Sequence, residues 1–168
     1  MITALIFGDD MKTAITFLVS CLVVPLASVG VRAQVPRPDP YKTSPELERR
    51  GQRVTPEDLR VLKRADEMLA TPASWNRHDA RVCPARATRW SLFCALQDAA
   101  HEVFGEERYR ALAIQEVRFT VEDRMTGLAI QHRLTDYNNL PSTRFADIKD
   151  VLKVTMDRVA ARLAAQQQ

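Results

Sequence analysis

The run Thr88-Arg-Trp-Ser-Leu-Phe-Cys-Ala-Leu-Gln-Asp-Ala-Ala-His-Glu-Val-Phe-Gly105 carries the most apolar helical pattern in the chain outside its N-terminal segment. Its apolar residues recur at steps of three and four, and they form two neighbouring rows on a helix surface. One row is Trp90, Phe93, Leu96, Ala100 and Phe104, and the other is Leu92, Ala95, Ala99 and Val103. A helix that is apolar on most sides must be covered by several neighbours. The run therefore predicts the central helix of a small bundle, which Gly105 is expected to end.

Two further patterns predict helices on either side of this run. Thr55-Pro-Glu-Asp58 places a hydroxyl at the N-cap, a proline in the first turn and acids beside unpaired backbone N–H groups, so a helix is expected from Pro56. Acids also open a third helix, which is expected from Glu106 to about Met125. Residues 117–121 alternate apolar and polar side chains, so a strand is the alternative there.

A long polar loop is expected before the last helix. The stretch 128–140 follows a glycine and lacks helical periodicity, which predicts an irregular connection. The last helix is expected to begin near Pro141, with Ser142 or Thr143 as its cap, and to continue close to the C-terminus. Together these patterns predict an all-α fold, a small bundle of about four helices with a long polar loop before the last one.

Residues 1–33 are interpreted as a signal peptide, with Met11 as the expected start. Met11-Lys12 gives a basic start to a long apolar run, whereas residues 1–10 carry acids and no base. The small residues of Val31-Arg-Ala33 suit cleavage before Gln34. The alternatives are an uncleaved anchor and a lipoprotein, because Leu18-Val-Ser20 before Cys21 resembles a bacterial lipobox. The segment predicts an exported protein, periplasmic or secreted.

Residues 34–54 are interpreted as a proline-rich flexible linker. Prolines alternate there with polar and charged residues, a composition that favours extended chain and offers nothing apolar to bury. A ligand for a proline-binding partner is the alternative. Residues 55–168 have the size of a single helical domain. No segment after the signal is apolar and long enough to span a membrane.

The charge and the histidine positions argue against several classes of ligand. The chain has 24 Lys plus Arg against 21 Asp plus Glu, and its net charge of +3 is too weak to indicate nucleic acid. No zinc spacing is present, and His78, His101 and His132 are widely scattered along the chain. Neither a metal nor a cofactor is expected.

Cys83 and Cys94 are expected to form a disulfide. They are the cysteines left after signal cleavage, and a pair in an exported chain favours a bond. The bond would join an arginine-rich loop to the central helix. The alternative is two separate buried thiols, because Cys94 lies among apolar residues. The spacing is not Cys-x-x-Cys, so it does not indicate a redox centre.

A candidate site is expected where the polar loop meets the arginine-rich segment. His132 is the natural base near neutral pH, Asp136 would orient it, and neighbouring asparagines would donate hydrogen bonds to an oxyanion. Structural roles are the alternative: turn residues, solvated arginines and a tryptophan that plugs the core. In that case Tyr137 packs inward beside Trp75, and Asn138 bonds backbone groups at the start of the last helix. The full candidate set is His132, Asp136, Tyr137, Asn138, Asn139, Trp75, Arg77 and Arg81.

Trp75, Ser91-Leu-Phe-Cys-Ala-Leu96 and Asp136-Tyr-Asn-Asn139 with Thr143 resemble the pattern of a bacterial family of small all-helical domains of unknown function. The resemblance covers about residues 59–163 and implies a helical fold, without implying a mechanism. Tyr137 stands where that family tends to have tryptophan. Asn139 stands where it tends to have aspartate, so no acid or metal role is carried over to that position.

Two functions from different classes are compatible with these patterns. The favoured one is a non-catalytic module of the cell envelope, which binds a protein or small-molecule partner or serves a structural role. It is favoured because the strong signals in the sequence are core, cap and disulfide. The alternative is a small hydrolase-like enzyme that uses His132 and Asp136.

The signal-peptide interpretation predicts the mature N-terminus. Mass spectrometry of the exported protein should find a chain that begins at Gln34, because signal peptidase requires small residues such as those ending at Ala33. A mature chain that begins at a lipidated Cys21, or one that keeps its apolar segment, would contradict this interpretation.

Overall fold

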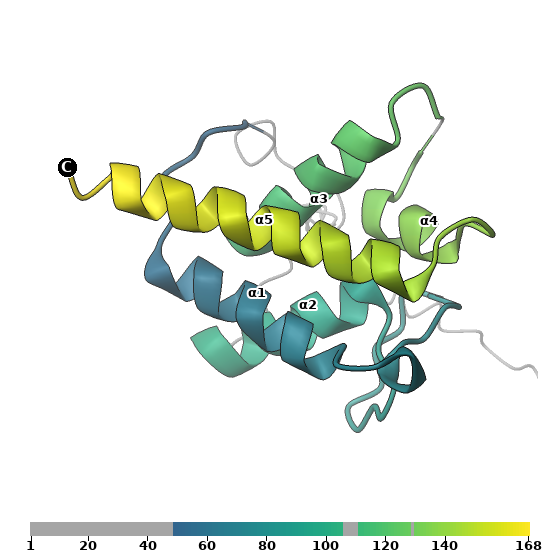
Figure 1. The fold of residues 1–168 in the computed structure, drawn as a ribbon. Coiled ribbons are helices and arrows are strands. Elements are labelled where there is room, and N and C mark those ends of the chain that lie inside the picture. Colours follow the sequence, from purple (N-terminus) through teal and green to yellow (C-terminus); the bar gives the residue numbers. More distant parts are fainter. Residues whose placement is uncertain (1–48, 106–110, 129) are drawn as a thin grey trace, which may run out of the picture. The chain divides into compact units, whose positions relative to one another are not determined.

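The part of the chain described by this computed structural model is all-helical, as predicted, and covers residues 49–105, 111–128 and 130–168. The predicted signal segment 1–33 and most of the linker lie outside these residues. Figure 1 shows the helices in chain order. They are α1 (Pro56–Met68), the short 3-10 helix η1 (Pro72–Ser74), α2 (Leu92–Phe104), α3 (Leu112–Arg124), α4 (Arg133–Asn139) and α5 (Phe145–Ala165).

The centre of the bundle is formed by α1 and α3. Each of these helices packs against three others: α1 against α2, α3 and α5, and α3 against α1, α4 and α5. In Figure 1, α1 and α5 run side by side. The apolar rows of α2 are buried as predicted from Leu92 to Leu96 and at Ala99 and Ala100. However, α2 packs mainly against α1 and α4, so the prediction that it is the central helix is corrected.

One buried carboxylate caps two helices. The predicted N-cap of α1 is confirmed: Asp58 Oδ2 accepts hydrogen bonds from the backbone N–H and the hydroxyl of Thr55, both at 2.9 Å. Asp58 Oδ1 also accepts the backbone N–H of Ala113 in the first turn of α3, at 3.0 Å. The N-cap residue of α3 is Ala111, whose side chain cannot accept a hydrogen bond. Asp58 therefore fixes the start of α3 against the start of α1.

The glycine at the end of α2 has the predicted role. Gly105 adopts a left-handed conformation (φ 72°), and its backbone N–H donates to the carbonyl of His101 at 2.8 Å. The predicted third helix is present as α3, and residues 117–121 are helical rather than a strand. Its expected start at Glu106 lies outside the described residues.

Two predictions near the last helix are corrected. The stretch 128–140 is not wholly irregular, because residues 133–139 form α4. The cap of α5 is neither Ser142 nor Thr143, since the helix begins after Arg144, whose backbone N–H donates to Asp147 Oδ2 at 2.8 Å. Thr143 is buried, and its hydroxyl donates to the carbonyl of Tyr137 at 2.7 Å. This bond ties the end of α4 to the approach to α5.

Polar side chains also join α3 to α5. The hydroxyl of Thr155 donates to the hydroxyl of Thr120 at 2.8 Å inside the core. Glu116, itself buried, pairs with Arg162 at 2.6 Å. Among the described helices, none has the length and hydropathy that crossing a membrane requires.

The double cap predicts that Asp58 contributes more to stability than an ordinary surface acid. Asp58→Ala should lower the free energy of unfolding by about 2–4 kcal/mol, because it removes a cap from α1 and leaves a buried N–H of α3 without an acceptor. Urea unfolding followed by circular dichroism measures this change.

Glu57→Ala is the matched control for Asp58→Ala. Glu57 also lies in the first turn of α1, but within the described residues its carboxylate pairs with Arg60, which is exposed. Removing it should cost less than about 0.5 kcal/mol. Equal effects of the two substitutions would contradict the role of Asp58 in capping α3.

Candidate functional site

The candidate residues gather where the segment 74–81 lies against α4. The segment is held to Trp90, which lies two residues before α2. The backbone N–H of Asn76 donates to the carbonyl of Trp90, and the N–H of Trp90 donates to the carbonyl of Ser74, both at 2.8 Å. Trp75 between these bonds is 8 % exposed and belongs to the core. Its ring lies 6.2 Å from the ring of Phe145 in α5, centre to centre. Trp75 thus closes one end of the core.

Asn138, at the C-terminal end of α4, is fully buried. Its Oδ1 accepts hydrogen bonds from Trp75 Nε1 at 2.8 Å and from the backbone N–H of Leu92 at 3.1 Å. Its Nδ2 donates to the carbonyls of Asn76 and Arg77 at 3.1 and 3.0 Å. One side chain therefore joins α4, the first residue of α2 and the irregular segment before it. The prediction that Asn138 bonds backbone groups at the start of the last helix is therefore wrong, because its partners lie in the segment 75–77 and at the start of α2.

Asn139 and Asp79 extend this network by one step. Asn139 Oδ1 accepts the backbone N–H of Asp79 at 2.8 Å, and Asn139 Nδ2 donates to the carbonyl of Asp79 at 2.9 Å. The buried carboxylate of Asp79 accepts the backbone N–H of Arg81 at 2.6 Å and the hydroxyl of Thr135 at 3.4 Å. Arg81 has a φ of 60°, so Asp79 also stabilises a left-handed turn at a residue other than glycine.

The structure does not bring the carboxylate of Asp136 to the imidazole of His132. Asp136 Oδ2 accepts the backbone N–H groups of Gln131 and His132, both at 2.8 Å, and so caps α4. The ring Nε2 of His132 instead lies 2.7 Å from Arg81 Nη1. Because a guanidinium only donates, His132 Nε2 is the acceptor in this contact. Both side chains are exposed to solvent.

Arg77 and Tyr137 also make internal contacts. Arg77 Nη2 donates to the carbonyls of Leu140, at 3.1 Å, and of Pro141. Tyr137 is buried as predicted, and its hydroxyl donates to the carbonyl of Asp147 at 3.4 Å. Burial raises the pKa of this hydroxyl, so the group is a neutral donor at physiological pH.

The structure thus brings the candidate residues together in one cluster, but three of them, Trp75, Tyr137 and Asn138, are buried, and most of the polar atoms of the cluster bond other parts of the fold. Sequence reasoning did not give Asp79 a role. An aspartate in a loop commonly accepts the backbone N–H two residues ahead, as Asp79 does from Arg81, and this tendency could have indicated a turn there.

The predicted disulfide is present between Cys83 and Cys94. Cys94 lies in the first turn of α2, is 5 % exposed and donates its backbone N–H to the hydroxyl of Ser91 at 3.2 Å. Cys83 is half-buried in the loop that precedes α2. The bond therefore fastens the middle of this loop to the start of the helix.

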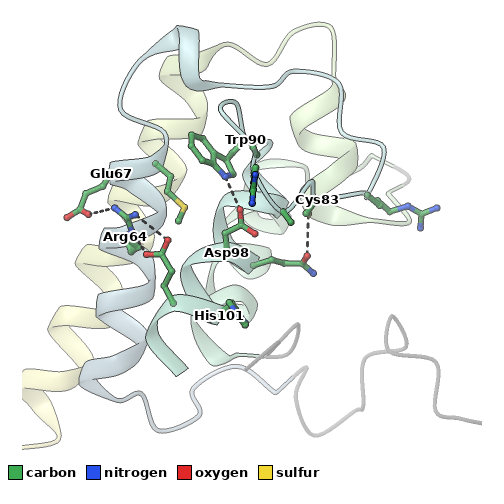
Figure 2. Close-up of a pocket in the computed structure, with 13 residues that line it drawn as sticks. Arg64, Glu67, Cys83, Trp90, Asp98 and His101 are labelled. Atoms are coloured by element: carbon green, nitrogen blue, oxygen red, sulfur yellow. Dashed lines mark hydrogen bonds and ion pairs between the residues drawn. The ribbon is translucent and has the colours of Figure 1, made fainter. Parts of the chain in front are cut away.

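A groove of about 720 Å³ lies beside the disulfide. In Figure 2, Arg64 and Glu67 of α1 line one side, Cys83 lies toward the other, and Trp90 and Asp98 lie between them. This volume falls within the range of small-molecule sites in proteins. Sequence reasoning missed the groove, because its walls come from α1, α2 and the loop between them. The remaining lining residues are Met68, Arg81, Ala85, Arg86, Ala87, Gln97, His101 and Glu102.

The carboxylates of the groove are already paired. Arg64 binds Glu102 through Nε and Nη2, at 2.5 and 3.2 Å, and Glu67 through Nη1 at 3.2 Å. Asp98 Oδ2 accepts the indole N–H of Trp90 at 2.9 Å. Within the described residues, no group of three His, Cys, Asp or Glu side chains is arranged to hold a metal ion.

A protein-family model described as "Family of unknown function (DUF6197)" matches residues 53–158. The match includes all of α1 to α4, the disulfide and most of α5. No curated protein matches the chain, and no solved structure does.

The bonding of Asn138 predicts a structural role that His132 does not share. Asn138→Ala should lower the free energy of unfolding by about 1–3 kcal/mol, because it leaves a buried indole N–H and a buried backbone N–H without acceptors. His132→Ala removes only an exposed contact and should change it by less than about 0.5 kcal/mol. Thermal and urea unfolding of both variants provide the comparison. Unchanged stability of Asn138→Ala, together with lost binding in both variants, would instead assign these residues to a ligand site.

Proposed function

We propose that this chain, which belongs to the DUF6197 family of unknown function, is an exported, disulfide-stabilised binding module of the cell envelope. In this proposal the groove between α1, α2 and the loop 81–90 takes up a small molecule or a segment of a partner protein. The proposal rests on the groove, which lies next to a polar cluster whose side chains mainly bond the fold itself.

Export is supported by the cysteine chemistry. A disulfide persists in an oxidising compartment and is rare in the reducing cytosol. The bond between Cys83 and Cys94 agrees with the apolar N-terminal segment, whose features are those of a signal peptide.

Binding is supported by the character of the groove. It is a concave surface that combines an aromatic side chain, Trp90, with arginines whose guanidinium groups can bind anionic groups. The hydrolase alternative has less support. The carboxylate that would orient His132 bonds backbone N–H groups, and the imidazole contacts Arg81.

Site-specific photo-crosslinking tests the groove as the binding surface. The full chain is expressed in its native cells with a photo-reactive phenylalanine analogue at Ala85, an exposed lining residue. A discrete crosslinked species should form, and a second substitution that fills the groove, Ala87→Trp, should reduce it at least fivefold.

The same analogue at Ala160, on the exposed side of α5, is the matched control and should give no such species. Equal crosslinking from positions 85 and 160, or a species that is insensitive to Ala87→Trp, would contradict the proposed site. Ester hydrolysis by the purified mature chain that is lost in His132→Ala would support the enzyme alternative instead.

A further inference from the structure

The two sulfurs of the disulfide differ in their access to solvent. Cys94 is 5 % exposed and lies among the apolar residues of α2, whereas Cys83 is half-buried and lines the groove. Figure 2 shows Cys83 at the edge of the groove. Cys83 is therefore the more accessible of the two cysteines to a thiolate that enters the groove, where its sulfur lies 3.3 Å from the amide oxygen of Gln97. Access decides which sulfur of a disulfide is attacked.

The groove also supplies positive charge near Cys83. Arg81 and Arg86 flank Cys83 in the sequence and line the same groove. Within the described residues, neither arginine forms an ion pair with a carboxylate. Glu67 and Glu102 pair with Arg64, the carboxylate of Asp98 accepts the neutral indole N–H of Trp90, and Arg81 contacts His132. Arginine side chains favour ligands that carry carboxylates.

We propose that Cys83 is a site of thiol–disulfide exchange with small thiols that carry carboxylate groups, and that the groove binds these thiols through Arg81 and Arg86. This inference goes beyond the proposed binding function and does not depend on which partner the groove takes up.

The exchange is balanced in atoms and electrons. The external thiolate attacks Sγ of Cys83, a new S–S bond forms between them, and the bond between Cys83 and Cys94 breaks. The electron pair of the broken bond leaves with Sγ of Cys94, so one thiolate is consumed and one is produced. The leaving sulfur lies in the first turn of α2, where the helix dipole favours a negative charge.

The fold provides anchors on both sides of the released loop. Before the loop, the side chain of Asn139 bonds the backbone N–H and the backbone carbonyl of Asp79. After it, the backbone bonds of Trp90 with Ser74 and Asn76 hold the entry to α2. Neither anchor uses the disulfide, and Asp79 also holds the backbone of Arg81, so exchange should free residues 82–88 and open one wall of the groove without unfolding the bundle.

The test is a charge series of small thiols acting on the oxidised mature chain. The probes are 3-mercaptopropionate, 2-mercaptoethanol and cysteamine, which are similar in size and are anionic, neutral and cationic. Each rate is divided by the rate of the same thiol with a small free disulfide, which removes differences in intrinsic reactivity. The normalised rates should fall in that order, with about a tenfold spread at low salt that shrinks as salt is added.

The site of the adduct and the arginine dependence complete the test. Acid quenching and mass spectrometry should find the added thiol on Cys83 and a free thiol at Cys94. Arg86→Ala should reduce the preference for the anionic thiol at least threefold. Arg60→Ala is the matched control, because Arg60 is an exposed arginine of α1 outside the groove, and it should leave the preference unchanged.

Three results would overturn the proposal. They are an adduct on Cys94, normalised rates that do not depend on thiol charge, and a rate that is independent of thiol concentration. The last result would mean that the disulfide reacts only after the protein unfolds.

Discussion

The side chain of Asn138 is the constraint on which this end of the molecule depends. The segment 74–81 is mostly irregular, so its carbonyls and the indole N–H of Trp75 need partners inside the protein. A primary amide can both accept and donate, and Asn138 does both while it is fully buried. Leaving such buried groups unpaired would cost about 1–3 kcal/mol each. The position of α4, the burial of Trp75 and the start of α2 are therefore coupled through one residue.

Asp58 has a similar role at the opposite end of α1. It caps its own helix and supplies the acceptor that α3 cannot provide for itself. Both residues are polar, buried and bonded to segments distant in sequence, and both determine where a helix begins. Apolar packing alone tolerates sliding of one helix along another, because it is not directional. Directional bonds at helix ends fix the register of this bundle.

The sequence predicted the parts of this fold that depend on neighbouring residues. The N-cap of α1 and the glycine after α2 follow from local chemistry, and both are present. The helix α4 was missed because it has only 7 residues, too few for a periodic apolar pattern to register. Asn138 was singled out, but its bond to Trp75 spans 63 residues. A single sequence contains no signal for such a pairing, nor for a groove whose walls come from separate elements.

The residues that stabilise this end of the fold differ from the loop residues that line the groove. The buried bonds of Asp79 and Asn138 lie on one side of the loop, and those of Trp90 lie on the other side. Between them the loop is largely exposed, with Val82 74 % exposed, and the disulfide fastens its middle to α2. Substitutions within residues 80–88 that keep Cys83 therefore remove few buried contacts. Because most of a domain's stability resides in such contacts, the loop can alter what the groove accepts at little cost to folding.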